Sequence, residues 1–266
     1  MAVIHMNFRS SRISRSVYPL IFLPDLNQWR DIDPPYPTLY FLHGYSGGAV
    51  ETAMFSNIAL YAMRYSVAVV LVDGENSFYT DDEKRGACFS RFIGEELVEV
   101  TRSVLPLSGR KEDTWIAGIS MGGYGALING LRFRERFSKI GMLSPALGYK
   151  LQNNEAPENC PVPAGELLET LGPWENYAGS YRDEKHMIIS AAESGQPVPE
   201  IFLGIGKSDS LYPAAKHFRE YSRKAGLNPE WYEAAGGHDH TFWKAAMDPL
   251  FHFLTGKEAD PACTLR

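Results

Sequence analysis

One short stretch constrains the fold of this chain more than any other. Residues 115–127 read W-I-A-G-I-S-M-G-G-Y-G-A-L, which predicts a buried strand, a very tight turn and the start of a helix. Within it, residues 118–122 form G-x-S-x-G, a pattern that presents a serine, Ser120, at a sharp strand-to-helix turn. The backbone there is strained, and a side chain two residues to either side would collide with the neighbouring strand or helix. The turn leaves the backbone N–H of Met121 free at a helix N-terminus, where negative charge is stabilised.

The residues around this pattern support the interpretation. Five residues with three fixed positions also arise by chance, so the pattern alone decides little. An apolar strand precedes it, and Leu127, Ile128 and Leu131 continue it as an apolar helix. A strand before and a helix after are the context that a nucleophilic serine at this turn requires. We therefore take Ser120 as the candidate nucleophile.

Apolar runs alternate with helix-like segments along the chain. Further strands are expected at residues 3–8, 16–23, 38–42, 67–72, 139–143, 200–205 and 230–233. Helices are expected at residues 50–65, 92–105, 183–193, 213–225 and 240–254, and a polar loop at 73–86. This alternation predicts an α/β fold with a mostly parallel central sheet and helices on both faces.

The carboxyl ends of the strands should form one rim, because ligands bind at that edge of such sheets. Four residues that lie just past strand ends should share this rim: His43, Asp73, Ser120 and Ser144.

Length and composition fit one globular domain. With 266 residues, 44% hydrophobic and 22% charged, the chain is expected to be a single domain over residues 1–266. A net charge of −6 gives no basic face for nucleic acid or for an anionic membrane. The three cysteines, Cys88, Cys160 and Cys263, lack a C-x-x-C pair, which favours free thiols in a reducing compartment. Without a signal-peptide pattern or a membrane-length apolar run, we expect a cytoplasmic protein.

Residues 145–199 interrupt the regular pattern. Four prolines between residues 157 and 173 break this region, and only residues 183–193 look clearly helical. A surface excursion is one interpretation. A long insertion at the rim of the sheet is more often functional, so we expect a cap over the candidate site.

A serine at this turn is inert unless a base removes its proton and an acid holds the base in the right tautomer. In this kind of fold the chain order is serine, acid, histidine. His238 suits the base because it lies in a glycine turn between a strand and the last helix. The other histidines after the serine suit surface, packing or capping roles: His186, His217, His240 and His252.

Asp209 is the best candidate for the acid, because it directly follows a strand. Asp239 is too close to its own histidine to orient the ring, and Asp113 precedes the serine. A simpler alternative is that Asp209 caps the helix after it, a common role for aspartate.

An oxyanion hole needs two backbone donors, of which Met121 supplies one. The other should come from residues 43–48, H-G-Y-S-G-G, which resemble the HG-type loop of esterases. His43 itself is expected to be structural, because it precedes the serine and lies in a tight loop.

Six segments together resemble the esterase D branch of the α/β hydrolases, which includes tributyrin esterases, feruloyl esterases, S-formylglutathione hydrolases and mycolyltransferases. They are residues 41–47, 73–81, 118–126, 135–138, 206–212 and 236–243. The resemblance implies an α/β-hydrolase fold with Ser120 as nucleophile, Asp209 as acid and His238 as base. It places the two oxyanion donors on the backbone N–H groups of Tyr45 and Met121. The nearest branch is that of the small bacterial tributyrin esterases.

The combined interpretation is a serine carboxylesterase that hydrolyses short-chain acyl esters through an acyl-serine. It implies a small-molecule ester as substrate and no metal or cofactor, and a homo-oligomer is compatible with it. One alternative is an S-formylglutathione hydrolase-type thioesterase or an acyltransferase with the same triad. The S-formylglutathione hydrolase branch usually carries a cysteine where residues 46–47 are Ser-Gly, which disfavours it. A catalytically inactive binding module is the alternative from another class, and the complete triad argues against it.

Overall fold

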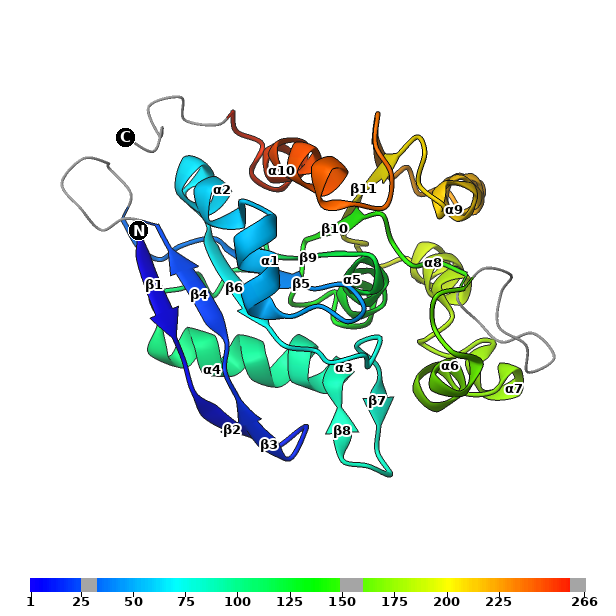
Figure 1. Ribbon diagram of the computed structural model, residues 1–266, viewed down its shortest axis with the longest axis horizontal. Helices are drawn as coiled ribbons and strands as arrows, with labels where there is room; N and C mark the ends of the chain where they lie inside the picture. The colour runs from blue at the N-terminus through cyan, green and yellow to red at the C-terminus, as the bar shows by residue number, and fades with distance from the viewer. Residues whose placement is uncertain (25–32, 149–159, 259–266) are drawn as a thin grey trace.

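Eight strands form the central sheet of the computed structural model, which describes residues 1–24, 33–148 and 160–258. They are β1 (Ala2–His5), β4 (Leu20–Leu23), β5 (Thr38–Leu42), β6 (Ala68–Val72), β9 (Thr114–Ile119), β10 (Lys139–Leu143), β11 (Glu200–Gly206) and β12 (Glu230–Ala234). Their order in the sheet is β1-β4-β6-β5-β9-β10-β11-β12 (Figure 1). All neighbours from β6 to β12 are parallel, and β1 and β4 form an antiparallel edge. The predicted mostly parallel sheet is confirmed.

Apolar residues on both faces of the strands build two separate cores. In β5, Leu39 and Phe41 join the cluster on one face, whereas Tyr40 and Leu42 join the cluster on the other. This follows from the two-residue period of a strand, which sends successive side chains to opposite faces. A strand that is buried on both faces is apolar along most of its length, as residues 39–42 of this one are.

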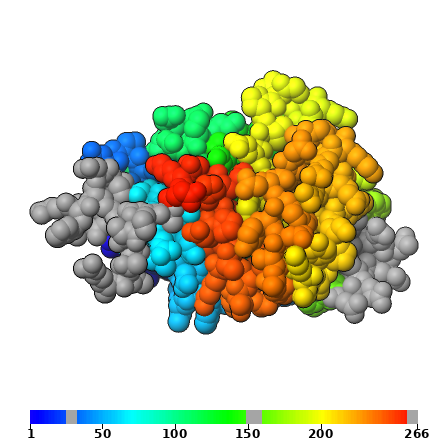
Figure 2. Space-filling view, turned by 90° about the horizontal axis from the view of Figure 1, so that it is seen from above, coloured from blue at the N-terminus to red at the C-terminus, as the bar shows by residue number. Residues whose placement is uncertain are grey.

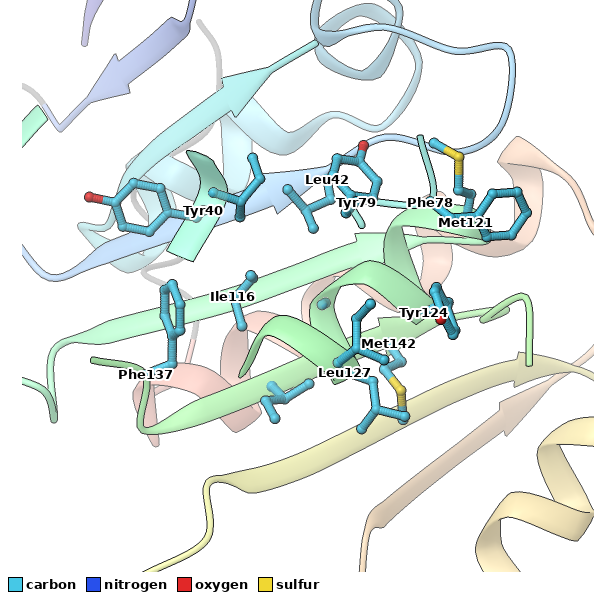
Figure 3. Close-up of a cluster of buried hydrophobic side chains, with 14 of the residues drawn as sticks. Tyr40, Leu42, Phe78, Tyr79, Ile116, Met121, Tyr124, Leu127, Phe137 and Met142 are labelled. Carbon is cyan, nitrogen blue, oxygen red and sulfur yellow. The ribbon is translucent and has the colours of Figure 1, made fainter. Parts of the chain in front are cut away.

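Helices cover both faces of the sheet. One face carries α1 (Ala49–Phe55), α2 (Ile58–Tyr65) and α10 (His240–Thr255), whose apolar residues share one cluster. The other carries α4 (Leu97–Val104), α5 (Met121–Arg132), α8 (Glu184–Glu193) and α9 (Tyr212–Lys224). In the space-filling view the orange and red C-terminal segment, with α10, adjoins the cyan α1–α2 region (Figure 2). Figure 3 shows side chains from β5, β9, β10 and α5 filling the layer between sheet and helices.

Two expected helices are interrupted in the structure. The helix expected at residues 50–65 divides into α1 and α2, because Asn57 adopts a left-handed conformation with φ 58°. The hydroxyl of Ser56 accepts a hydrogen bond from the N–H of Ile58 at the same break. The helix expected at residues 92–105 begins earlier, with α3 (Phe89–Arg91) and a π-helical turn (Phe92–Glu96) before α4. Short polar side chains that bond to nearby backbone end a helix locally, which apolar periodicity does not reveal.

The segment expected to be a polar loop at residues 73–86 contains two fully buried aromatic side chains, Phe78 and Tyr79. The hydroxyl of Tyr79 donates a hydrogen bond to the carbonyl oxygen of His43, at 3.0 Å. The segment also leads into a two-stranded hairpin of β7 (Asp81–Asp82) and β8 (Ala87–Cys88). It therefore anchors the loop that follows β5 to the core.

The region that interrupts the sequence pattern contains two helices in addition to the expected one. They are α6 (Ala164–Leu171) and α7 (Trp174–Tyr177), and the described part of the region begins at residue 160. The expected helix at residues 183–193 is α8, and the carboxylate of Asp183 caps it by accepting hydrogen bonds from two backbone N–H groups. The prolines obscured α6, because Pro163 lies at its N-cap, where proline is well tolerated.

The turn after β9 is held by very close backbone packing. Ser120 has φ 56° and ψ −116°, a strained conformation for a residue other than glycine. A Cβ on Gly122 would lie 2.2 Å from the carbonyl oxygen of Leu42, and one on Gly118 would lie 2.4 Å from backbone atoms of Gly122. Glycine at both positions is therefore what lets β5, β9 and α5 meet at this turn.

We expect Gly122→Ala to lower the free energy of unfolding by about 2 kcal/mol or more, because its Cβ would meet backbone rather than a mobile side chain. Gly165→Ala, in α6, is the matched control. Apart from its chain neighbours and the backbone of its own helix, no atom of the described residues lies within 4 Å of the Cβ it would add. The substitution should therefore stabilise the protein by about 0.5 kcal/mol. Urea unfolding of both variants measures the difference. A Gly122→Ala protein as stable as the parent would contradict this account of the turn.

Candidate active site

Three side chains meet at the carboxyl edge of the sheet. Ser120 follows β9, Asp209 follows β11, and His238 follows β12. The Nε2 atom of His238 lies 2.9 Å from the Oγ atom of Ser120. Its Nδ1 atom lies 3.1 Å and 3.2 Å from the two carboxylate oxygens of Asp209. The structure thus brings together the serine, acid and base that the sequence predicted, in one hydrogen-bonded chain.

The carboxylate of Asp209 is fully buried and ionised. Burial raises the pKa of Asp209, but hydrogen bonds from His238, from the backbone N–H of Leu211 and from the Ser144 hydroxyl outweigh it and leave the pKa below its ordinary value. A buried carboxylate facing Nδ1 fixes the imidazole proton on that atom. Nε2 is then free to accept the proton of Ser120.

Asp209 also holds the turn before α9. Its Oδ1 atom accepts a hydrogen bond of 2.8 Å from the N–H of Leu211, the residue that precedes the first helical turn. No side chain bonds to the helix from that N-cap position. The capping alternative is therefore right in part, because the same carboxylate serves the turn and faces His238.

The loop that carries His238 is tied to the loop that carries Asp209. The N–H of Ser208 donates to the carbonyl of Gly236 at 2.9 Å, and the N–H of Lys207 donates to the carbonyl of Ala234 at 2.9 Å. The imidazole also lies edge-on to the ring of Trp243, with centroids 5.2 Å apart. Trp243 stands in the first turn of α10 and packs beside His238, a position that no feature of the sequence had marked.

The rival residues occupy other positions. His240 begins α10, where its ring packs at a tilt against that of Phe55 and its Nε2 atom lies 3.9 Å from a carboxylate oxygen of Glu51. Asp239 is the N-cap of α10 and accepts hydrogen bonds from the N–H groups of Thr241 and Phe242. Neither is part of the chain that ends at Ser120. The remaining histidines bond elsewhere or pack on helix surfaces: His186, His217 and His252.

Two backbone N–H groups in the turns next to Ser120 are the predicted oxyanion donors. Those of Tyr45 and Met121 have no hydrogen-bond acceptor within the described ranges. A Cβ on Gly44 would lie 3.5 Å from the Cβ of Ser120, so the loop after β5 packs directly on the turn. Free donors on both sides of a serine are what an oxyanion requires.

His43 holds this loop in place as a neutral imidazole. Its Nε2 atom accepts a hydrogen bond of 2.8 Å from the N–H of Gly74, and its Nδ1–H donates to the carbonyl of Gly44 at 2.7 Å. Burial lowers the pKa of His43, which keeps the ring uncharged. It makes no contact with Ser120, in agreement with the structural role expected for it.

The side chain of Tyr45 links the same loop to the region of residues 160–199. Its hydroxyl donates a short hydrogen bond to the carboxylate of Glu166 in α6. Burial and this carboxylate raise the pKa of Tyr45 to about 12. No sequence motif marks this contact, because the two residues are far apart in the chain and neither belongs to a recognisable pattern.

Two cavities meet at Ser120, and Tyr45, Pro161 and His238 line both of them. One measures about 280 Å³ and we call it the Leu211 cavity; it is completed by Phe78, Met121, Ala146, Val162, Ser210 and Leu211. The other measures about 290 Å³ and we call it the Glu51 cavity; it is completed by Gly44, Gly47, Glu51, Thr52, Ser56, Ile119, His240 and Trp243. Figure 3 shows Phe78 and Met121, which line the Leu211 cavity, at the same end of the core.

Comparison with known proteins identifies the family. A family model described as "Putative esterase" matches residues 10–254. The acetyl esterase of Caldicellulosiruptor saccharolyticus is 33% identical over 262 residues, which are 96% of this chain and 98% of that protein. The chain belongs to the Esterase family. The iron(III) enterobactin esterase of Escherichia coli K12 is more distant, at 28% identity over 69% of this chain and 42% of its own length.

Solved structures place this esterase among the α/β hydrolases by fold. The fluorophosphonate-binding serine hydrolase FphF of Staphylococcus aureus superposes with a TM-score of 0.83 at 23% identity, covering 96% of this chain and 99% of its own. The S-formylglutathione hydrolase FrmB of the same organism gives 0.82 at 24% identity, with 96% and 98% coverage. The predicted esterase D-like family, the fold and the class of carboxylic ester hydrolase are therefore confirmed.

Three further observations concern the esterase outside this site. Among the described residues, no three His, Cys, Asp or Glu side chains are grouped so that they could hold a metal ion. No helix in the same ranges has both the length and the apolar character needed to cross a bilayer. Cys88 and Cys160 are free thiols, and Cys263 lies outside the described residues.

Asp209→Asn tests what the acid does. The asparagine oxygen can still accept from the N–H of Leu211, so the turn before α9 should persist. Its amide would face Nδ1 with a donor and favour the wrong imidazole tautomer, so kcat should fall by about 10⁴-fold. Asp239→Asn is the control, since asparagine caps helices as well as aspartate does, and it should keep parental kcat. Thermal unfolding and kcat are measured together; a less stable but fully active Asp209→Asn enzyme would leave the residue only a turn-forming role.

Proposed function

We propose that this esterase hydrolyses short-chain acyl esters through an acyl-serine on Ser120, with His238 as base and Asp209 as acid. The observation that carries the proposal is the chain of hydrogen bonds from Asp209 through His238 to Ser120. The free N–H groups of Tyr45 and Met121 beside the serine support it further. The 33% identity to an acetyl esterase favours small acyl groups.

The proposed reaction follows from the tautomer of His238, whose Nδ1 atom carries the proton and whose Nε2 atom is free to accept one. Nε2 of His238 takes the proton of Ser120 as its Oγ attacks the ester carbonyl, and the buried carboxylate stabilises the imidazolium that forms. The negative oxygen of the tetrahedral intermediate accepts hydrogen bonds from the N–H groups of Tyr45 and Met121. His238 then protonates the leaving alcohol. In the second half, it activates a water molecule that releases the acid from Ser120.

The two cavities suggest where each half of the ester binds. Among the described residues that line the Leu211 cavity, Tyr45 and His238 are the only ionisable ones, which suits an apolar acyl chain. The Glu51 cavity also contains Glu51 and His240, which suit a leaving group with polar atoms. We therefore propose that the acyl group occupies the Leu211 cavity.

We also propose that residues 145–199 form a cap within a single domain over residues 1–266. Pro161 and Val162 line the cavities, and Glu166 bonds to the loop beside Ser120. Both observations support a cap that limits the length of the acyl pocket. The cytoplasmic location and the homo-oligomer stay predictions. A thioesterase or acyltransferase activity with the same residues is tested by including S-formylglutathione and alcohol acceptors among the substrates.

Ser120→Ala should fold normally and lose hydrolysis by about 10⁴-fold or more in kcat, because no other group can form the acyl intermediate. A fluorophosphonate probe should label the parent on Ser120 and leave this variant unlabelled. Ser103→Ala, an exposed serine of α4 whose hydroxyl bonds to its own helix, is the control and should label fully. Labelling of the Ser120→Ala protein would show that another residue is the nucleophile. Absence of hydrolysis from the parent protein would instead argue for the inactive binding module.

Acyl length tests the cavity assignment. With p-nitrophenyl esters, kcat/KM should peak between acetyl and butyryl and fall by about tenfold or more at octanoyl, because a short pocket leaves methylenes in water that would otherwise contribute about 0.8 kcal/mol each. Leu211→Ala should move the optimum to longer acyl chains. Thr52→Ala enlarges the Glu51 cavity instead and should leave the acyl profile unchanged. A parent enzyme that prefers octanoyl esters would contradict the cap. If Thr52→Ala moved the acyl-length optimum and Leu211→Ala did not, the acyl group would be assigned to the Glu51 cavity instead.

A further inference from the structure

Ser144 stands directly after β10 in an unfavourable backbone conformation. Its φ is 47°, in the left-handed region, and the residue is fully buried. Its N–H donates to the carbonyl of Gly204 at 2.8 Å, so this turn is tied to β11. Glycine would adopt the conformation without strain. Serine, unlike glycine, also places a hydroxyl group at this buried position.

The hydroxyl of Ser144 receives a hydrogen bond from Trp243. The indole Nε1–H lies 3.0 Å from Oγ, and indole nitrogen is a donor only. The proton of Ser144 is therefore not used in this contact and is available to an acceptor. The acceptor on its other side is the buried carboxylate of Asp209, which the Ser144 hydroxyl helps to keep ionised.

Trp243 contacts the base as well. Its ring meets the imidazole of His238 edge to face, at 5.2 Å and 86° between planes. The indole therefore restrains His238 through its ring and Asp209 through Ser144. The contacts form a closed circuit, from Trp243 to Ser144 to Asp209 to His238 and back to Trp243.

We propose that Ser144 and Trp243 are positioning residues of the esterase, which fix the carboxylate of Asp209 against His238. The proposal rests on the roles proposed above for Ser120, Asp209 and His238. Neither residue is a catalytic residue in this scheme, because each acts through the acid or the base. Ser144 directs one donor onto the carboxylate, and Trp243 sets the direction of that donor.

The scheme predicts a specific change in pH dependence. Without the Ser144 hydroxyl, the carboxylate of Asp209 has one donor fewer, so its charge is less dispersed. It should then stabilise the imidazolium that forms on His238 during the reaction more strongly. The other ionisable groups that adjoin His238 or line the cavities with it, Tyr45, Glu51, Asp239 and His240, are unchanged by the substitution. The acid limb of the kcat/KM profile should therefore move to higher pH.

Ser144→Ala and Ser144→Gly provide the test. Both remove the hydroxyl, but glycine also relieves the backbone strain, so Ser144→Gly should be the more stable of the two. In both, kcat should fall by about tenfold with KM within about twofold, as expected for loss of a hydrogen bond to a charged group. The acid limb should rise by about half a pH unit in both. If Ser144 served only the turn, Ser144→Gly would keep the parental kcat and the parental limb, and that result overturns the proposal.

Trp243→Phe tests the second residue. Phenylalanine keeps an aromatic ring beside His238 and removes the donor to Ser144. The variant should lower kcat and shift the acid limb in the same direction as Ser144→Ala. The double variant should lose no more than Ser144→Ala alone, because the indole N–H acts through the hydroxyl. If the losses of kcat in the two single variants added fully in the double variant, the two residues would act independently, and the proposed coupling between them would be wrong.

Ser108→Ala is the matched control. Ser108 is also a fully buried serine, and its hydroxyl donates to an aspartate, Asp113, at 2.7 Å, outside the residues that line the cavities at Ser120. This variant should keep the parental pH profile. An equal shift there would mean that the shift reports lost stability, and would overturn the proposal. Ser120→Ala separates the two hypotheses, because an active Ser120→Ala enzyme refutes the proposed triad, whereas an inactive one with unshifted Ser144 variants refutes only the positioning role.

Discussion

The close approach of α5 to the end of β5 is the constraint on which the site depends. A Cβ at Gly122 would lie 2.2 Å from the carbonyl of Leu42, so only glycine lets the helix start there. The strained Ser120 precedes this contact and the loop of Gly44 and Tyr45 follows it. One packing contact therefore fixes both the serine and a backbone donor beside it. The strain at Ser120 is balanced by burial of the elements that meet around it, as is usual for strained residues at functional sites.

Two histidines near the serine are suited to different roles because their surroundings differ. His43 is enclosed by backbone groups, one donating to it and one accepting from it, and its lowered pKa keeps it neutral and fixed. His238 faces a buried carboxylate on one side and a hydroxyl on the other, so it can gain a proton and have that charge stabilised. The same side chain thus supports a loop in one place and is suited to proton transfer in the other. At His43 burial outweighs the charges of Asp73 and Glu51, whereas the ring of His238 bonds directly to a carboxylate.

Sequence reasoning worked where local chemistry determines the structure. The apolar run of β6 and the glycines around Ser120 could be interpreted from residue types alone, and the strand at residues 139–143 agrees with β10. Prediction from the sequence failed where contacts between residues distant in the chain determine the structure. Phe78 and Tyr79 lie among polar neighbours and are nonetheless fully buried, because the loop folds back under the residues after β5. The break at Asn57 depends on one left-handed residue, which periodicity averages out.

In the candidate site, the sequence allowed the residues proposed to carry out the chemistry to be recognised, but not the residues that position them. Ser120, Asp209 and His238 stand next to glycines or directly after strands, and such positions can be recognised in a sequence. Trp243 and Glu166 stand on helices, where an indole or a carboxylate has no distinctive local pattern. Their partners, Ser144 and Tyr45, come from loops elsewhere in the chain, and only folding brings each pair together.

In the proposed mechanism, the contact between Tyr45 and Glu166 would couple substrate selection to the geometry of the proposed oxyanion donors. Tyr45 presents its backbone N–H beside Ser120 and lines both cavities with its side chain. Its hydroxyl is held by α6, the helix that follows Pro161 and Val162 in the cavity walls. A shift of α6 that reshaped either cavity would therefore pull on the residue that supplies one of the two donors. In such an arrangement, acyl specificity and stabilisation of the tetrahedral intermediate cannot vary independently. We therefore expect the size of the cavity to change through side chains such as Leu211 rather than through movement of the helix.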